Sequence, residues 1–349
     1  MHKSFASIAL PITEEEYRND GNLHYSTLAS FDRGGFDSIP TLGEKKESPS
    51  LLFGSIVDLM ITGSREEFDK QYIIAEFATL KPAHLTVVKA LFEKYHVQYP
   101  KLSKIPDADL LEVADSVEFG KTWKEATRIN SIRTECEEYY NLMTLAEGKT
   151  VIDQQTYDEA AAAARALRSS PATAWYFAKD NPFDDIERVY QAKFKAEIDG
   201  IMYSCMADLI VIDHKEKKIY PCDLKTSSHK EHEFFLSFMD WRYYIQANQY
   251  AAIIKANIAK DDYFKDFEVM NYRFIVVNRT SLNPLVWEYP YTFTDVMVEI
   301  QNSKGYPYHF RNFREIGKEL HHYLETGQTV PDGINVEGTN NIVDWIKKM

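Results

Sequence analysis

The segment ERVYQAKFKAEIDGIMYSCMADLIVIDHKEKKIYPCDLK runs from Glu187 to Lys225 and decides the fold prediction. Residues 188–198 alternate apolar and polar side chains, which is typical of a half-buried β-strand. The dipeptide Asp199-Gly200 favours a two-residue hairpin turn, so residues 201–212 are expected to return as the partner strand. A charged turn then leads into a third strand at residues 219–226. The segment therefore predicts three consecutive strands of one sheet.

Apolar periodicity on both sides of this segment predicts helices and further strands. Helices are expected over residues 50–63, 160–167, 236–256 and 310–324, and strands over residues 272–278 and 285–289. Residues 1–50 carry glycine and proline breakers and are expected to be loop-rich. We therefore expect an α/β protein with a mixed central sheet flanked by helices and a helical N-terminal elaboration.

A chain of 349 residues fits either one domain with large insertions or two closely packed domains. The pattern favours a single domain over residues 1–349. Within it we expect a helical elaboration at residues 64–180, a sheet core at residues 186–290 and a C-terminal helical tail at residues 310–349.

Composition excludes several classes of protein. The hydrophobic share of 44% and the charged share of 27% are ordinary for a globular protein. Three cysteines are too few for a disulfide framework or a four-thiolate iron–sulfur cluster. The sequence contains no apolar run long enough for a transmembrane helix, and its first residues are too weakly apolar for a signal peptide. No membrane association and a cytoplasmic location are the expectation.

Three polar residues are predicted to meet at one end of the apolar strands. Asp208 lies near the end of the second strand, and Asp223 and Lys225 lie two positions apart on the third, so they share a face. Two carboxylates on neighbouring strands can hold a divalent cation and a water molecule beside it, which is the chemistry of phosphodiester cleavage. A structural salt bridge is the alternative, but the position of the residues at the strand ends favours the metal site.

Residues 50–63 contain a further acid in an unusual setting. Ser50 is a suitable N-cap and Gly63 a suitable stop for an apolar helix, and Asp58 lies inside it. Charged side chains are seldom buried without a partner, so Asp58 is a candidate ligand. The alternative is a polar residue on an exposed stripe of this helix.

The chain resembles the PD-(D/E)xK nuclease superfamily, and within it the phage and prophage exonucleases of the exodeoxyribonuclease VIII (RecE-like) type. These are related to the lambda-exonuclease and RecB nuclease domains. The resemblance covers roughly residues 25–325 and is carried in order by Ser50–Asp58, Ile186–Tyr190, Met206–Asp208, Cys222–Thr226 and Gln246–Tyr250. Two positions depart from the family pattern, because relatives often have His where Asp58 stands and Pro where Ala207 stands.

The resemblance implies a restriction-endonuclease-like core and a role for each matched residue. Asp208 and Asp223 would bind Mg²⁺, which Mn²⁺ can replace, with the Leu224 carbonyl and Asp58 as further ligands. Lys225 would stabilise the attacking hydroxide or the charge on phosphorus. Glu187 would be a second-metal acid, or else a surface strand residue. Gln246 and Tyr250, four apart on one helical face, would hold DNA or the metal site, or else would simply pack.

The implied function is a Mg²⁺-dependent exodeoxyribonuclease that degrades one strand of linear duplex DNA for phage-type recombination in a bacterial host cell. A single-strand annealing protein and a ring-shaped homo-oligomer are the partners that this family implies. The alternatives are a structure-specific or restriction-like endonuclease on the same fold and an inactive DNA-binding protein.

The net charge of −13 argues against a protein that coats nucleic acid without sequence preference. It is compatible with a nuclease, because a carboxylate-rich metal site is itself negative and a bound cation reverses the local field. DNA would then need a local basic strip, for which the candidates are Lys225, Lys230, Arg242, Arg273 and Arg279. The alternative is that these are ordinary surface cations.

Overall fold

The computed structural model describes residues 2–43, 48–76, 80–146, 148–179, 181, 185–291, 300–301, 307–308 and 310–329. The chain forms two compact units, one of residues Met1–Gly54 with Arg165–Met349 and the other of residues Ser55–Ala164. The chain therefore leaves the first unit after Gly54 and returns to it at Arg165. The helical elaboration expected at residues 64–180 falls mostly in the second unit, and residues 330–349 of the expected C-terminal tail lie outside the described part.

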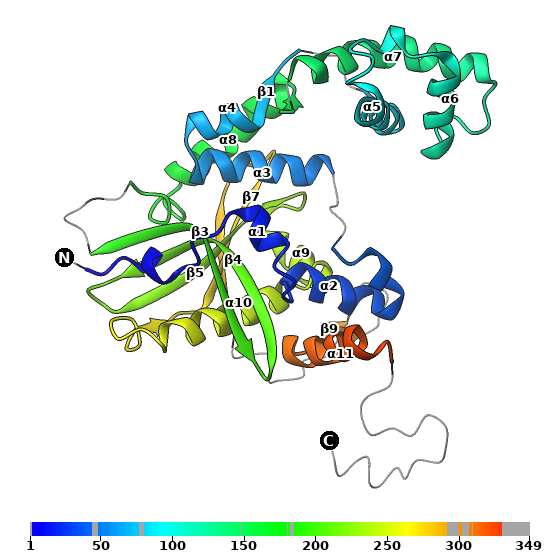
Figure 1. The fold of residues 1–349 in the computed structure, drawn as a ribbon. Helices are drawn as coiled ribbons and strands as arrows, with labels where there is room; N and C mark the ends of the chain where they lie inside the picture. Colours follow the sequence, from blue (N-terminus) through cyan, green and yellow to red (C-terminus); the bar gives the residue numbers. More distant parts are fainter. Residues whose placement is uncertain are drawn as a thin grey trace, which may run out of the picture. The chain divides into compact units, whose positions relative to one another are not determined.

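The first unit is built on a mixed sheet with the strand order β3-β4-β5-β7-β8, in which the short β6 also pairs with β5 (Figure 1). Its strands are β3 (Ile186–Ile198), β4 (Ile201–Asp213), β5 (Lys218–Ser227), β6 (Glu268–Val269), β7 (Tyr272–Asn278) and β8 (Leu285–Tyr289). The pairs β3–β4, β4–β5 and β7–β8 are antiparallel, whereas β5 runs parallel to β6 and β7. The predicted mixed α/β fold is confirmed.

The hairpin between β3 and β4 forms at the predicted dipeptide. Asp199 and Gly200 both adopt positive φ angles, of 54° and 81°. Two-residue hairpin turns favour this left-handed backbone because its twist matches that of the strands, and Asp-Gly adopts it readily. The register then runs from Ile198↔Ile201 to Ile186↔Asp213.

Helices of the first unit cover the sheet. They are η1 (Phe5–Ile8), α1 (Glu14–Arg18), α2 (Tyr25–Gly34), η2 (Gly35–Thr41), the start of α3 (Pro49–Thr62), η4 (Glu231–Glu233), α9 (Phe234–Asp240), α10 (Tyr243–Ile258) and α11 (Phe313–Thr326). Helix α10 packs against β3 and β4. The core between them includes Phe194, Tyr203, Ile210, Ile254 and Phe274, all at most 1% exposed. A two-stranded ladder of β9 (Ile300–Gln301) and β10 (Pro307–Tyr308) lies outside this sheet.

The start of α3 lies on the other face of the sheet from α10. A Cβ atom added at Gly54 would come within 3.0 Å of the Thr226 hydroxyl on β5. Asp223, three residues earlier on β5, contacts α10 instead. Side chains alternate between the two faces of a strand, so these contacts assign α3 and α10 to opposite faces.

The second unit is mainly helical and has a core of its own. Beyond the rest of α3 it contains α4 (Arg65–Gln71), α5 (Pro82–Tyr95), η3 (Leu102–Lys104), α6 (Asp107–Ser116), α7 (Glu125–Leu145) and most of α8 (Gln154–Ser169). Two short parallel strands, β1 (Tyr72–Ile74) and β2 (Thr150–Ile152), were not predicted. Val87, Leu91, Leu110, Ile132 and Tyr140 are buried at its centre.

Residues 1–50, expected to be loop-rich, contain the helices α1 and α2. One prediction about a helix was wrong. The helix expected over residues 236–256 is two helices, because Trp241 and Arg242 interrupt it between α9 and α10. Among the residues described, no helix combines the length and apolar character that a bilayer crossing requires.

Candidate active site

Asp208 and Asp223 come together where the β4–β5 ladder ends. The last register pair of these antiparallel strands is Leu209↔Cys222, so the two aspartates are the next opposing residues. The Asp208 carboxylate accepts a hydrogen bond of 3.0 Å from the Leu224 backbone N–H. The N–H and C=O of one strand residue point to the same side, so the Leu224 carbonyl also faces β4. Two carboxylates and one carbonyl therefore meet at this end of the sheet.

Asp223 is 1% exposed and is held from two sides. The Gln246 side-chain amide on α10 donates a hydrogen bond of 2.5 Å to Asp223 Oδ1. The Lys225 ammonium forms an ion pair of 2.5 Å with Asp223 Oδ2. A carboxylate this deeply buried needs both partners, because an isolated charge in a protein interior is very costly.

Lys225 is a permanent cation in this setting. Burial alone would lower the pKa of its ammonium group, but the negative charge of Asp223 and, further away, that of Asp208 outweigh burial and raise this pKa. The ammonium also lies 4.5 Å from the centre of the Tyr243 ring, a favourable cation–π distance. The raised pKa favours the ammonium form of Lys225, which can stabilise nearby negative charge.

The chemistry of the donor set suits a hard divalent cation. Among the residues described, no three His, Cys, Asp or Glu side chains form a metal-binding group. The available ligands are the carboxylates of Asp208 and Asp223, the carbonyl of Leu224 and the buried Gln246 Oε1, which has no hydrogen-bond partner in the described part. Mg²⁺ and Mn²⁺ prefer such oxygens, and Mg²⁺ usually keeps several of its own waters. The residues present therefore fit Mg²⁺ with one or two protein carboxylates.

Glu187, expected as a metal ligand, lies in a different network. It is paired with Ile212, four residues along β4 from Asp208, which is a separation of about 13 Å on a strand. Its carboxylate accepts hydrogen bonds from the Ser4 hydroxyl and the Phe5 backbone N–H and lies 3.0 Å from the His214 ring. The structure therefore separates Glu187 from the aspartate pair, because the strand register spaces them along the sheet.

Gln246 and Tyr250 share a face of α10 as expected, but that face is buried. Tyr250 is 6% exposed and packs against Tyr272, with ring centres 6.2 Å apart. Burial raises the pKa of the Tyr250 hydroxyl well above its ordinary value. Gln246 contacts Asp223. The substrate-binding role of the pair stays a prediction.

Asp58 is half-buried on the part of α3 that belongs to the second unit. Its backbone carbonyl accepts a hydrogen bond from the Thr62 hydroxyl, as in the interior of many helices. Its role as a metal ligand stays a prediction.

The five candidate cations do not act as one basic strip. Arg242 pairs with Asp32 at 2.9 Å, and Arg273 pairs with Glu288 at 2.8 Å. Arg279 lies over the Phe53 ring at 4.8 Å, and Lys230 belongs to the turn before η4. Lys225 forms an ion pair with Asp223.

Sequence patterns missed the aromatic surroundings of Lys225. Tyr243 at the start of α10 and Tyr25 at the start of α2 lie with ring centres 6.2 Å apart. The Tyr25 hydroxyl donates a hydrogen bond of 2.6 Å to the Trp241 carbonyl. Tyr25 is more than 200 residues away in the chain, so only the packing of α2 against α10 reveals it.

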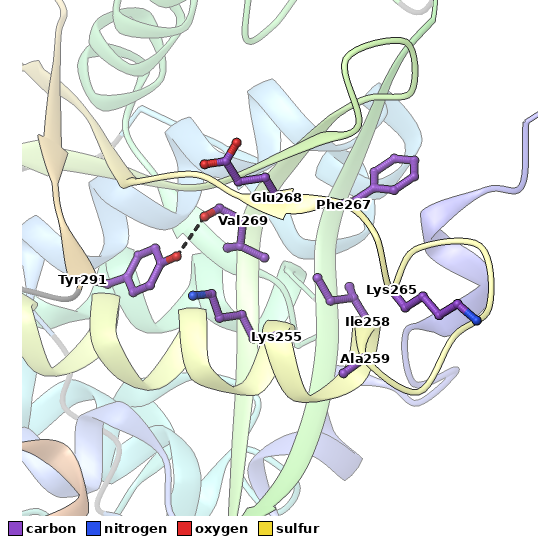
Figure 2. A pocket seen from close by; sticks show the side chains of 8 residues that line it. All are labelled: Lys255, Ile258, Ala259, Lys265, Phe267, Glu268, Val269 and Tyr291. Atoms are coloured by element: carbon purple, nitrogen blue, oxygen red, sulfur yellow. Dashed lines mark hydrogen bonds between the residues drawn. The ribbon is translucent and has the colours of Figure 1, made fainter.

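A hollow of about 410 Å³ lies at the other end of α10 (Figure 2). Its lining includes Lys255, Lys265, Phe267, Val269 and Tyr291, and the Tyr291 hydroxyl donates a hydrogen bond to the Val269 carbonyl. Lys255 is nine residues beyond Gln246, which is about 14 Å along a helix. This hollow is therefore separate from the aspartate pair.

Comparisons with known proteins found little. No family model matches the chain, and no curated protein matches it. Among solved structures, the chain is similar to the crystal structure of a "putative exonuclease" from Eubacterium rectale, with 11% sequence identity and a TM-score of 0.43. The match covers 97% of this chain and 100% of that one.

Proposed function

We propose that the protein is a Mg²⁺-dependent deoxyribonuclease of the PD-(D/E)xK type, with a restriction-endonuclease-like core. The observation that carries this proposal is the meeting of Asp208, Asp223 and Lys225 at one end of the mixed sheet. Burying a carboxylate next to a second carboxylate and a cation costs desolvation free energy. A salt bridge that only stabilises the fold does not need the second carboxylate. Perturbed groups of this kind cluster at functional sites.

Each residue has a distinct task in this proposal. Asp208 and Asp223 hold Mg²⁺ together with the Leu224 carbonyl, and Asp58 is a further candidate ligand; Mn²⁺ can substitute. When bound, the metal lowers the pKa of a water molecule and stabilises charge on the phosphate. Lys225 contributes a fixed positive charge to the developing negative charge. Gln246 keeps Asp223 in position.

The finer proposal is an exonuclease that degrades one strand of linear duplex DNA in phage-type recombination. It rests on the order of the motifs, which resembles that of exodeoxyribonuclease VIII-like enzymes. A single-strand annealing protein and a ring-shaped homo-oligomer are the proposed partners. The chain's net charge of −13 supports a need for DNA ends, because general attraction to internal duplex sites is weak.

Cleavage assays with Asp208→Asn and Asp223→Asn test the proposal. Each variant is expected to lose at least 100-fold in cleavage of end-labelled linear DNA with Mg²⁺, about 2.7 kcal/mol or more in the barrier. Asp262→Asn is the matched control, because Asp262 is a fully exposed aspartate of the same unit. Thermal melting of all three variants separates loss of catalysis from loss of fold. Activity within tenfold of wild type in a folded Asp223→Asn protein would contradict the metal site.

The same assay distinguishes exonuclease from endonuclease. Linear plasmid is expected to be degraded and the covalently closed circle to persist. Discrete fragments from the closed circle would favour a restriction-like or structure-specific endonuclease. Tight DNA binding without cleavage of either form, at any Mg²⁺ or Mn²⁺ concentration, would favour the inactive DNA-binding protein.

A further inference from the structure

The break between α9 and α10 is held by long-range contacts rather than by local sequence. Arg242 adopts a left-handed backbone with φ of 60°, which costs a residue other than glycine about 1–2 kcal/mol. Its guanidinium donates a hydrogen bond of 2.7 Å to the Met239 carbonyl and forms an ion pair of 2.9 Å with the buried Asp32 of α2. Such strained backbones persist where the surroundings impose them, and they cluster at functional sites.

An exposed aromatic residue lies at this break. Trp241 is 53% accessible and directly precedes Arg242. The Arg33 guanidinium lies 5.3 Å from the centre of the indole ring. Arg33 is an exposed cation of α2 with no ion pair to a carboxylate in the described part of the chain. The half-exposed indole thus has a positive charge close to its ring.

Trp241 is connected to Lys225 through two tyrosines. The Trp241 carbonyl accepts the hydrogen bond from Tyr25, the Tyr25 ring lies against Tyr243, and the Tyr243 ring lies 4.5 Å from the Lys225 ammonium. Burial raises the pKa of both tyrosine hydroxyls, so both rings stay neutral. The backbone of Trp241 is therefore three contacts away from Lys225, and Trp241 and Arg33 lie on the elements that supply these contacts.

We propose that Trp241 and Arg33 form a stacking site for an unpaired base of the DNA strand that enters the active site. The inference rests on the proposed nuclease function and adds the form of DNA that the site accepts. Stacking on an aromatic side chain contributes about 1–3 kcal/mol per base and tolerates any sequence. The Arg33 guanidinium adds a contact to a DNA phosphate. This local positive charge offsets the repulsion between DNA and a chain of net charge −13. The site thus favours a single strand or a frayed end over an intact duplex.

Binding is measured separately from cleavage. The probe is a short fluorescein-labelled thymidine oligonucleotide, titrated with the full-length protein in EDTA and followed by anisotropy. Trp241→Ala is expected to weaken binding at least fivefold, whereas Trp241→Phe stays within about threefold of wild type because phenylalanine also stacks. Arg33→Ala is expected to weaken binding and to make the slope of log K against log salt shallower by about 0.7. The matched control is Trp123→Ala, since Trp123 is 46% exposed and lies in the second unit.

Equal affinities of wild type and Trp241→Ala for the oligonucleotide would overturn the stacking site. So would an equal loss of affinity for a relaxed, covalently closed duplex circle, which has neither ends nor hairpin loops. A Mg²⁺-dependent cleavage assay on the same variants keeps the two proposals apart. Cleavage that needs Asp223 but is indifferent to Trp241 removes the stacking site and leaves the nuclease. Trp241-dependent binding without any cleavage removes the nuclease and leaves a site for single-stranded DNA.

Discussion

A single amide on α10 fixes the orientation of the Asp223 carboxylate, and this contact makes a prediction at the scale of one residue. Gln246→Ala leaves one buried carboxylate oxygen without its donor, which costs about 1–3 kcal/mol of unfolding free energy. The rate of DNA cleavage is expected to fall more than substrate affinity, because Asp223 loses its position rather than its charge. Denaturant unfolding, kcat and KM are the measurements. Unchanged kcat would show that Lys225 alone positions Asp223.

The candidate site could be predicted from sequence where its residues are close along the chain. Asp223 and Lys225 share a face because strand side chains alternate, and the Asp-Gly turn fixed the register that brings Asp208 beside them. The ligand role of Glu187 stays a prediction, and the same register places it four residues along β4 from Asp208. Tyr25 and Arg33 gave no local signal, since their neighbours belong to helices more than 200 residues later.

At the scale of elements, α11 needs a glycine to pack against the sheet. A Cβ atom added at Gly317 would lie 2.9 Å from Tyr203 Cζ and 3.0 Å from Tyr203 Cε1 on β4. Gly317→Ala is therefore expected to lower the unfolding free energy by about 1–3 kcal/mol. The Tyr203 hydroxyl is buried and has no hydrogen-bond partner in the described part, so Tyr203→Phe should restore much of the loss in the double variant. A double-mutant cycle of unfolding free energies checks this, and additive effects would contradict the packing argument.

The Glu231 side chain links η4 to the connection between β7 and β8 by hydrogen bonds. Its carboxylate accepts hydrogen bonds from the Ser281 hydroxyl and from the backbone N–H groups of Asn278 and Asn283. Burial would raise the pKa of Glu231, but these hydrogen bonds outweigh burial and lower it below its ordinary 4.5. The folded protein therefore gains stability from Glu231 above about pH 4.5, and it loses this stability as the pH falls through the lowered pKa.

The variant Glu231→Gln tests the contribution of these hydrogen bonds to stability. The variant is expected to lose about 1–3 kcal/mol of unfolding free energy at pH 7, because an amide satisfies fewer of these donors. The difference from wild type should shrink as the pH falls below the ordinary pKa of a glutamate. Urea unfolding at pH 7 and pH 4 measures both effects. A difference that is the same at both pH values would contradict the lowered pKa.

Sequence patterns predicted the helices and strands whose formation depends on neighbouring residues. They failed where contacts between distant residues determine the structure. Strand β7 follows from a short apolar run, and the β3–β4 hairpin follows from alternation and from the Asp-Gly turn. The break at Trp241 and Arg242 does not, because Asp32 in α2 holds it. Helix propensity alone favours one continuous helix there, and tertiary contacts override it.

At the scale of the molecule, the acidic chain predicts weak dependence of DNA binding on salt. Because few cations lie near the site, we expect about three phosphate contacts. Each contributes about −0.7 to the slope of log K against log salt for a single strand, so the slope is expected near −2. A protein that coats DNA through a basic surface gives a much steeper slope. Anisotropy titrations over a range of salt concentrations measure it. A slope steeper than about −5 would point to a large basic surface instead.

The division into two units has a consequence for biosynthesis. Residues 55–164 are contiguous and have their own core, so they can fold while the strands of the first unit are still untranslated. Helix α2 is synthesised earlier, but α10 and α11, against which it packs, are synthesised much later. Until they are made, Leu28 and Phe31 of α2 stay exposed to water. The sheet therefore closes only after β8 has been synthesised, and for that interval the N-terminal segment exposes apolar side chains that invite misassociation.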